Sequence, residues 1–371
     1  MIPVDAGVER YQRRVDQAAS REVHAPAWAN PTAMGKTRPI AGAPAAPKGC
    51  YDADIIILAL ERVEETLAAI ASASRQTGVS AHIFVLDQGS CAKAVERLAR
   101  TVQVRSDVTL LATERNLGVA GGRNLISGLG HGRVIVALDN DAEFDSPDTV
   151  ARMVAALGAE PRLAAIGCRI VTYASGEDDL SSWGYPVGLL SRAGESFDAV
   201  TYVGAGHAIL REAWQQAGGY DSKLFFCWEE FDFCLRAIAL GWSIRYRGDI
   251  VIRHKVCAEQ RVGWTAARWF YFVRNRLYIE RKLDHGWIAL LPRIAGYMLK
   301  GIRNGLPVQT LCAIRAAARM APRATRPMPL QGLCYLARND LAHRGSIWRR
   351  LVREVLCRIN TPRDVASPVK R

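Results

Sequence analysis

Two adjacent glutamates, Glu229 and Glu230, begin an apolar helical segment within CWEEFDFCLRAIALGW, residues 227–242. Apolar side chains then recur at the spacing of one buried helix face. Carboxylates at a helix start are favoured by the helix dipole, and this is the purely structural explanation. Trp228 and Phe231 would also surround the pair with apolar groups, and crowding raises the pKa of one carboxyl toward that of a general base. We therefore predict a catalytic role for the pair.

A second acidic group, Asp139-Asn140-Asp141, stands where the apolar run 134–139 gives way to a loop. Hard oxygen ligands at this spacing can together face a divalent cation, and Mg²⁺ or Mn²⁺ suits such ligands. Asp and Asn also favour turns, so the triplet alone leaves a turn and a metal site equally open, whereas its strand context favours the metal site. His254 is a candidate third ligand, although a lone histidine at a strand end is more often structural. Together the two acidic groups suggest metal-assisted group transfer.

The segment ERNLGVAGGRN, residues 114–124, predicts an anion contact at a strand-to-helix turn. Its glycines permit close backbone approach, and the following helix offers free N–H groups. Arg123 could bind phosphate oxygens through both branches of its guanidinium. The segment is neither a Walker loop nor G-x-G-x-x-G, so its specificity is low by itself.

Apolar runs that alternate with helical patterns would position these groups. Strands are expected at residues 55–60, 82–87, 108–112, 134–139 and 163–171, and another apolar stretch lies around 201–210. Helices are expected at 63–75, 93–102, 119–129 and from 231. This alternation predicts an α/β fold, a doubly wound, mostly parallel sheet flanked by helices. Ligands of such sheets lie beyond the carboxyl ends of the strands, where Asp87 and Asp139 close two runs. The Gly/Ser/Asp-rich loop 174–196 would be either mobile or functional.

The length and charge of the chain suggest its domain organisation. The 371 residues predict a flexible arm at 1–50, a catalytic domain at 51–258 and a helical, basic region at 259–371. Residues 256–371 carry 22 Lys and Arg against six Asp and Glu, whereas the remainder has a net charge of −3. This asymmetry indicates an anionic partner. The basic, aromatic segment 264–282 suits anionic lipid, and a helical cap with outward arginines is equally open.

Other patterns limit the class of protein. Nine cysteines occur without a Cys-x-x-Cys pair, and no secretory segment is recognised, so we expect reduced cytosolic thiols. The apolar stretch 287–302 is interrupted by Pro292, Arg293 and Lys300 and is shorter than the ~20 residues of a spanning helix. We therefore expect no transmembrane helix. Because no nucleic-acid-reading motif is found, we also expect no nucleic-acid partner.

Six ordered segments resemble the inverting family 2 glycosyltransferases with the GT-A fold, in the bacterial branch of rhamnosyl- and galactofuranosyltransferase-like enzymes. The segments are VLDQGS (85–90), NLGVAGGRN (116–124), LDNDAEFDSP (138–147), GAGHAILREAW (204–214), GGYDSKLFFCWEEFDFCLRAIALGW (218–242) and the RHK around His254. The resemblance covers about residues 52–256. It implies a Mg²⁺- or Mn²⁺-dependent transfer, with inversion, from a nucleoside-diphosphate sugar to a hydroxyl acceptor in bacterial cell-surface glycan synthesis. The alternative is a catalytically inactive scaffold of the same family at the membrane surface.

The resemblance also implies a role for each candidate residue. Glu230 would be the general base, and Glu229 would support the base or the acceptor site. Asp139 and Asp141 would bind the metal and diphosphate, and His254 would contact the metal or a phosphate. The nucleotide would lie beside Asp87, Asn116, Gly118, Arg123 and Asp139, and the acceptor and sugar pocket would be formed by Gly204, Ala205, Gly206, His207 and Trp228.

Two departures from the family pattern concern the nucleotide. Relatives commonly end the first strand in a Thr-Tyr-Asn-like stretch, where this chain has Ala59-Leu60-Glu61, and Gln88 replaces the usual acidic residue or Asn after Asp87. The base is Glu where Asp is more frequent. The expected partners are a nucleotide-sugar donor and a glycan or lipid-linked acceptor. The expected location is the cytoplasm, with a peripheral position on the inner face of the plasma membrane.

Overall fold

The computed structural model describes residues 37–255, 266–322, 327–346 and 348. In these residues a single sheet has the strand order β1-β4-β3-β2-β5-β9-β7-β10-β6, and β8 pairs with β10. The strands are β1 (Thr37–Gly42), β2 (Ala53–Ala59), β3 (Ala81–Asp87), β4 (Val108–Thr113), β5 (Val134–Asp139), β6 (Ala142–Phe144), β7 (Leu163–Thr172), β8 (Ser196–Ala199), β9 (Gly206–Leu210) and β10 (Ser243–His254). The bounds of β2 to β5 and of β7 agree closely with the strands that the apolar runs predict, and β9 is the last part of the apolar stretch around 201–210. Strands β1, β6, β8 and β10 were not among the expected strands.

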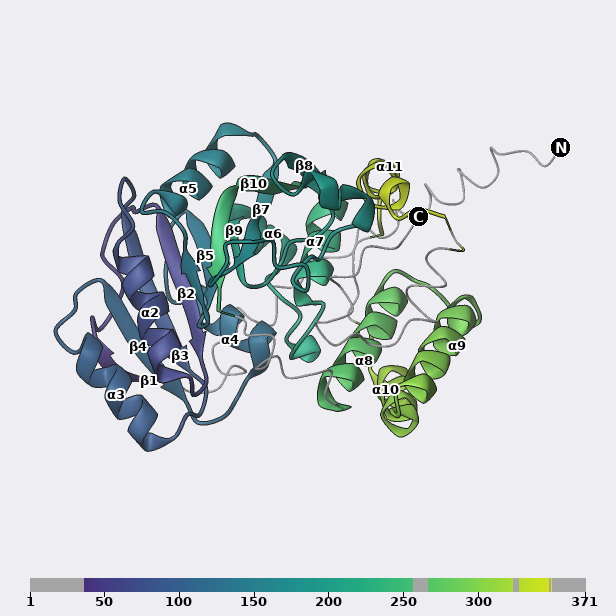
Figure 1. Ribbon diagram of the computed structural model, residues 1–371, viewed down its shortest axis with the longest axis horizontal. Helices are drawn as coiled ribbons and strands as arrows, with labels where there is room; N and C mark the ends of the chain where they lie inside the picture. The colour runs from purple at the N-terminus through teal and green to yellow at the C-terminus, as the bar shows by residue number, and fades with distance from the viewer. Residues whose placement is uncertain (1–36, 256–265, 323–326, 347, 349–371) are drawn as a thin grey trace.

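Helices cover both faces of the sheet (Figure 1). Residues of α2, α3 and α5 pack in one buried cluster, and residues of α4, α6 and α7 pack in a second. The helices are α2 (Val63–Ser74), α3 (Ala92–Val102), α4 (Gly118–Ser127), α5 (Thr149–Ala159), α6 (Arg211–Ala217) and α7 (Glu229–Ala239), with 3-10 turns η3 (Val187–Arg192) and η4 (Ser222–Leu224). The predicted α/β fold class is confirmed.

The sheet is mixed rather than mostly parallel. The pairs β2–β3, β3–β4, β2–β5 and β7–β10 are parallel, and the pairs that involve β1, β6, β8 or β9 are antiparallel. The prediction was correct for the first half, where strands and helices alternate regularly. It was wrong for β9, which lies antiparallel between β5 and β7, and for the antiparallel strands β6 and β8, whereas β10 is parallel to β7.

The predicted flexible arm at 1–50 needs a partial correction. Residues Thr37–Gly42 form β1, an edge strand paired antiparallel with β4, so this part of the arm is structured. Pro39 is tolerated because an edge strand leaves one row of backbone groups unpaired. Residues 1–36 lie outside the described residues.

Helices continue beyond the sheet as the sequence predicts. They are α8 (Ala266–Lys282), α9 (Trp287–Arg303), α10 (Pro307–Arg319) and α11 (Leu330–Asn339), followed by the 3-10 turn η5 (Leu341–His343). In the described part of the chain, no helix has both the length and the apolar character to cross a membrane. The seven cysteines that the structure describes are free thiols.

Helix α8 is an interior helix, and this decides between the two interpretations of segment 264–282. Trp269, Val273, Leu277 and Tyr278 are at most 1% exposed. Lys282 is also buried, and its ammonium contacts Asp221 at 3.0 Å and Asp232 at 2.5 Å. The described part of the segment therefore packs as a cap on the sheet-containing part of the chain, which favours the cap over the lipid contact.

Candidate functional site

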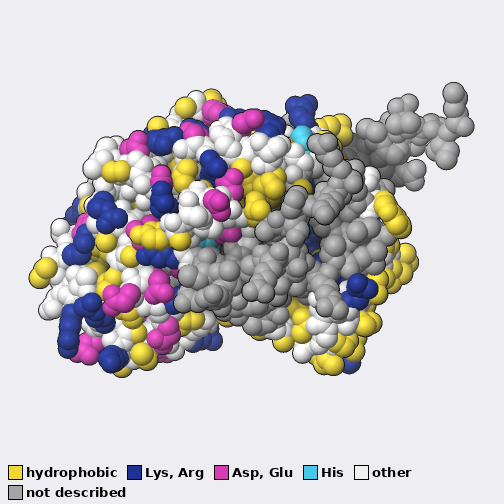
Figure 2. Space-filling model, viewed as in Figure 1, with side chains coloured by type: hydrophobic (Ala, Val, Ile, Leu, Met, Phe, Trp, Pro, Cys, Tyr) yellow, Lys and Arg dark blue, Asp and Glu magenta, His cyan; other side chains and the backbone are white. Residues whose placement is uncertain are grey.

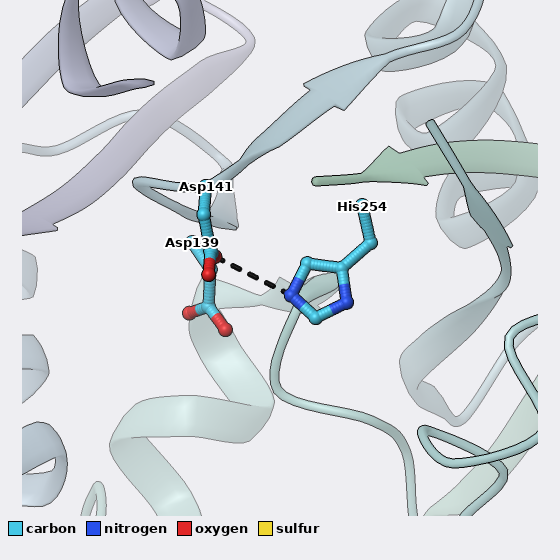
Figure 3. Close-up of side chains that lie close together, drawn as sticks. All are labelled: Asp139, Asp141 and His254. Carbon is cyan, nitrogen blue, oxygen red and sulfur yellow. Dashed lines mark ion pairs between the residues drawn. The ribbon is translucent and has the colours of Figure 1, made fainter. Parts of the chain in front are cut away.

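Asp139, Asp141 and His254 come together at one edge of the sheet. Asp139 ends β5, and Asp141 lies in the turn between β5 and β6. Strand β6 pairs with β10 so that Ala142 faces His254, and this register brings the histidine beside the turn. One ligand atom from each of the three side chains lies within 4.8 Å of the others (Figure 3). The sheet thus assembles the three residues predicted to bind a metal, although they are 115 positions apart in sequence.

The ring of His254 has a carboxylate on each side. Its Nε2 lies 3.3 Å from an oxygen of Asp141, and its Nδ1 lies 3.2 Å from Asp179 Oδ2. A carboxylate on the second ring nitrogen is the usual way in which proteins fix the orientation of a metal-binding histidine. The other oxygen of Asp141 contacts the guanidinium of Arg62, which immediately precedes α2.

Charge and burial shift the pKa values of His254 and Asp139. Burial opposes protonation of His254, but hydrogen bonds to Asp141 and Asp179 raise its pKa to about 9. Burial, with the nearby charge of Asp141, raises the pKa of Asp139 to about 6, against the opposing effect of Arg123. Since a metal-bound histidine must be neutral, a cation that uses Nε2 has to displace a proton.

Arg123 connects the acidic cluster to the glutamate pair. Its guanidinium contacts Asp139 at 2.9 Å, Glu230 at 3.1 Å and the carbonyl oxygen of Gly204 at 2.8 Å. The side chain is only 4% exposed, and neighbouring carboxylates keep its pKa above the ordinary value despite burial. Arg123 is therefore already paired with protein carboxylates, and it differs from the free phosphate ligand that the sequence suggested. Its position fixes the distance between Glu230 and Asp139.

The two glutamates at the start of α7 have different environments. Glu229 is 2% exposed, and its Oε2 has no hydrogen-bond partner. Burial, and then the adjacent charge of Glu230, raise the pKa of Glu229 well above its ordinary range, which favours the neutral form of this carboxyl. Glu230 faces Arg123. The crowding predicted from the sequence thus affects Glu229, whereas Glu230 is held by the guanidinium of Arg123.

The loop before the pair is strained and is supported by α8. Phe225, Cys227 and Trp228 have φ between 62° and 72°, a conformation that is costly for residues with a Cβ atom. The side-chain amide of Asn275 in α8 contacts the carbonyl oxygens of residues 224, 226 and 227 at 2.8–2.9 Å. Asn275 thereby orients the loop that carries the pair.

Gly204 is the member of the predicted acceptor group that faces this centre. A Cβ atom added there would lie 2.5 Å from Glu230 Oε1. We therefore expect Gly204→Ala to displace the carboxylate and to lower kcat by roughly 10²-fold, the effect of a misplacement of about 1 Å. Steady-state kinetics would measure this effect.

The matched control is Gly158→Ala, because an added Cβ at Gly158 would meet no atom within 4 Å. Both variants should unfold at urea concentrations close to that of the wild type. Equal turnover in the two variants would contradict the placement of Gly204 against the base.

The rest of the predicted acceptor group is less exposed to a ligand. Ala205 is buried, and its carbonyl oxygen accepts the N–H of Asp139. Gly206 packs against Ile252. His207 is 1% exposed, and Tyr220 and Val203 contact its two ring nitrogens, so the structure does not support an acceptor contact by this side chain.

Trp228 is half-buried and borders a cavity of about 180 Å³. Its indole N–H donates to the carbonyl oxygen of Phe272, which fixes the ring. Tyr185, Phe197 and Phe231 also line the cavity, together with Asp340 and Arg344 beyond α11. Aromatic walls with a few polar groups are typical of a small-molecule site.

The predicted nucleotide residues lie at the same edge of the sheet. Asp87 and Asp139 end β3 and β5, which flank β2, so strand spacing places them about 10 Å apart. Asp87 Oδ1 accepts two N–H groups of its own loop, and the buried Oδ2 has no partner. Asn116 Oδ1 accepts the N–H of Gly118, whose φ of 74° permits close approach to Phe225. Asn116 and Gly118 therefore shape the start of α4.

Three residues of the site were not predicted from the sequence: Arg62, Asp179 and Asn275. Arg62 directly follows the Ala59-Leu60-Glu61 stretch, whose departure from the family pattern was the available signal. Asp179 lies in the loop at 174–196, which was recognised only as mobile or functional. Asn275 gives no signal, because its contacts depend on how α8 packs.

Comparisons with known proteins are consistent with this geometry. The sequence model of the family described as Glycosyl transferase family 2 matches residues 54–216. The matched part, less than half of the chain, is thus similar in sequence to glycosyltransferase family 2 domains. Over 103 residues the chain is 33% identical to the succinoglycan biosynthesis protein ExoO of Rhizobium meliloti (strain 1021). That match covers 28% of this chain and 29% of the length of the relative.

Two solved structures are similar to the chain. GalNAc-T7 with UDP, GalNAc and Mn²⁺ has a TM-score of 0.55 and 14% identity, over 84% of this chain and 57% of that chain. This likeness shows the predicted GT-A-type fold. Mannosyltransferase PcManGT from Pyrobaculum calidifontis, in complex with GDP-Man and Mn²⁺, has a TM-score of 0.49 and 18% identity, over 93% of this chain and 90% of that chain.

Proposed function

We propose that the protein is an inverting glycosyltransferase that transfers a sugar from a nucleoside-diphosphate sugar to a hydroxyl acceptor. The observation that supports this most is the arrangement of Asp139, Arg123 and Glu230. One buried guanidinium contacts both an acidic group suited to a diphosphate-bound cation and a carboxylate suited to proton abstraction. A displacement at an anomeric carbon needs these two functions on opposite sides of the donor sugar.

The reaction is a single displacement. The acceptor oxygen forms a bond to the anomeric carbon while the bond from that carbon to the diphosphate oxygen breaks. The proton of the acceptor hydroxyl passes to Glu230, and the nucleoside diphosphate leaves with the electron pair of the broken bond. Arg123 keeps Glu230 in place, and burial raises the pKa of the adjacent Glu229 and so favours its neutral form.

The residues present fit a divalent cation. Two carboxylates and one imidazole offer hard and borderline ligands, and Asp179 orients the imidazole through its other nitrogen. Asp139, Asp141 and His254 would bind Mg²⁺ or Mn²⁺, which neutralises the charge of a leaving diphosphate. GalNAc-T7, with the same type of fold, contains Mn²⁺ and UDP in its solved structure, which supports this assignment.

The donor and acceptor are proposed to lie on either side of Glu230. The nucleotide would lie along the edge from Asp87 to Asp139, with the loop of Asn116 and Gly118 beside it. The acceptor would approach past Gly204 and Trp228. The cavity beside Trp228 is large enough for part of a sugar, at about 180 Å³. The catalytic domain would comprise residues 51–258, with a helical, basic region at 259–371.

We further propose a role in bacterial cell-surface glycan synthesis, with a glycan or lipid-linked acceptor on the cytoplasmic side of the membrane. The likeness to a succinoglycan biosynthesis protein supports this role. The rhamnosyl- and galactofuranosyltransferase-like branch is the proposed subgroup, on the basis of the sequence segments alone.

A donor screen tests the proposed function. The full chain is incubated with Mn²⁺ and a panel of nucleotide sugars, and the release of nucleoside diphosphate is measured with and without simple sugar acceptors. We expect one donor to be consumed faster than the others. If no donor is consumed or bound, the chain is the inactive scaffold of the alternative interpretation.

Asp179 provides a separate test of the cation site. We expect Asp179→Asn to weaken Mn²⁺ binding by roughly 10- to 100-fold, the usual cost of removing the carboxylate behind a metal-binding histidine. Binding of Mn²⁺ alone is measured by calorimetry or electron paramagnetic resonance. Asp178→Asn is the matched control, because Asp178 pairs with Arg169 at 2.6 Å instead of contacting His254. Equal loss of affinity in both variants would indicate a general disturbance of the loop.

A further inference from the structure

Helix α9 presents an unbroken apolar stripe to solvent. Ile288, Leu291, Leu299 and Ile302 are 84%, 58%, 42% and 59% exposed. Together with the exposed Ala295 they follow the spacing i, i+3, i+7, i+11 and i+14, so they lie on one face of the helix. Hydrophobic side chains, coloured yellow, gather on the lower right of the molecule, over α9 and α10 (Figure 2).

Helix α10 extends this surface and adds positive charge to it. Val308 and Leu311 are 66% and 49% exposed, and Arg315 and Arg319 continue the same face at i+7 and i+11. Arg303 is exposed at the end of α9. We call these residues of α9 and α10 the α9–α10 surface.

The α9–α10 surface is supported from behind by a small core of its own. Trp269, Val273 and Leu277 of α8 form a buried cluster with Ala313 and Ala317 of α10, and residues of α9 pack against it. The indole N–H of Trp269 donates to Thr310 at 2.8 Å. The stripe is thus the outer face of a packed three-helix unit, and the inner faces of the same helices already have their partners.

We propose that the α9–α10 surface binds the protein to an anionic lipid bilayer. A helix whose apolar face can enter the boundary between headgroups and acyl chains, next to arginines that reach anionic headgroups, is suited to an interfacial position. The net positive charge of residues 256–371 also favours an anionic bilayer, since these residues include 22 Lys and Arg against six Asp and Glu. The surface goes beyond the proposed reaction, because it involves none of the residues assigned to donor, cation or base.

Charge also favours a bilayer over a second copy of the chain. Two copies that met through this surface would bring Arg303, Arg315 and Arg319 of each near those of the other, without acidic residues on the stripe to balance them. Like charges at such a contact oppose association. An anionic bilayer instead balances these charges over its whole area.

Vesicle co-sedimentation of the full chain, without substrate, tests the proposal. We expect binding to phosphatidylcholine vesicles that contain phosphatidylglycerol, weaker binding to phosphatidylcholine alone, and a decrease with salt. The double variant Leu291→Ser/Leu299→Ser should bind roughly tenfold more weakly or worse. Arg303→Gln/Arg315→Gln should lose roughly fivefold for each charge on anionic vesicles only.

The matched control is Val104→Ser/Leu129→Ser, which removes two exposed apolar side chains from the catalytic part of the chain. It should bind vesicles like the wild type. The proposal is overturned if the wild type fails to bind anionic vesicles at low salt, or if the stripe variant binds as well as the control. It is also overturned if sedimentation equilibrium shows a wild-type dimer that the stripe variant dissociates while neither binds vesicles. These measurements need no transferase activity, so their failure is separate from failure of the proposed reaction.

Discussion

Replacing Glu230 by Gln should lower kcat by roughly 10²- to 10⁴-fold, the usual contribution of a general base, and should leave donor binding nearly unchanged. The amide keeps the shape of the carboxylate and can still accept a hydrogen bond from Arg123, which lies 3.1 Å from Glu230 Oε1. It cannot accept the proton of an acceptor hydroxyl. Turnover is measured with the donor found in the screen, and donor affinity by calorimetry.

Glu229→Gln is the matched control for this prediction. Burial and the adjacent Glu230 raise the pKa of Glu229 well above its ordinary range and so favour its neutral form, which an amide resembles in charge. We expect this variant to retain most of the wild-type kcat. The opposite pattern, with Glu229→Gln inactive and Glu230→Gln active, would reverse the two assignments. Full activity of both variants would remove the pair from the mechanism.

The sequence predicted the first half of the sheet well because its signals there are local. The strands of β2 to β5 are short apolar runs, and the helices between them have a regular apolar spacing. Parallel strands end at one edge of a sheet, so Asp87 and Asp139 could be placed together without a structure. The same reasoning failed for β9, which is antiparallel to both β5 and β7, because the direction of a strand depends on partners far away in sequence.

The residues of the candidate site likewise fall into those with a local sequence pattern and those whose contacts depend on packing. The acidic triplet and the glutamate pair carry their own sequence patterns, and both were predicted. Arg123 was predicted as a phosphate ligand from its place after glycines, but its contacts with Asp139 and Glu230 arise from the packing of α4 against α7 and β5. The raised pKa of Glu229 depends on its burial, which follows from that packing. Burial and long-range pairing were therefore the properties that the sequence alone could not supply.

The proposed membrane contact illustrates how the composition of a segment and its exposure in the fold differ. Segment 264–282 has the basic and aromatic composition of an interfacial helix, yet Trp269 lies in the core of the three-helix unit and Phe270 and Phe272 pack against that core. Helix α9 is less basic than segment 264–282. In the sequence, Pro292 of α9 indicated only that this helix does not span a membrane. In the structure α9 is the helix whose apolar face is exposed. Composition located the region, and only packing could identify the surface.

Replacing Asp141 by Ala should weaken divalent-cation binding by more than roughly 100-fold, because it removes a direct ligand rather than the carboxylate behind one. Donor binding that depends on the cation should be lost with it. Calorimetry with MnCl₂ alone, and then with UDP, GDP and dTDP in the presence of Mn²⁺ or chelator, separates the two effects. Asp145→Ala is the matched control, since Asp145 follows β6 and pairs at the surface with Arg253 at 2.5 Å. Nucleotide affinity that is unchanged in Asp141→Ala, with and without chelator, would contradict the cation site and leave Arg62 and Arg123 as the groups that balance the diphosphate.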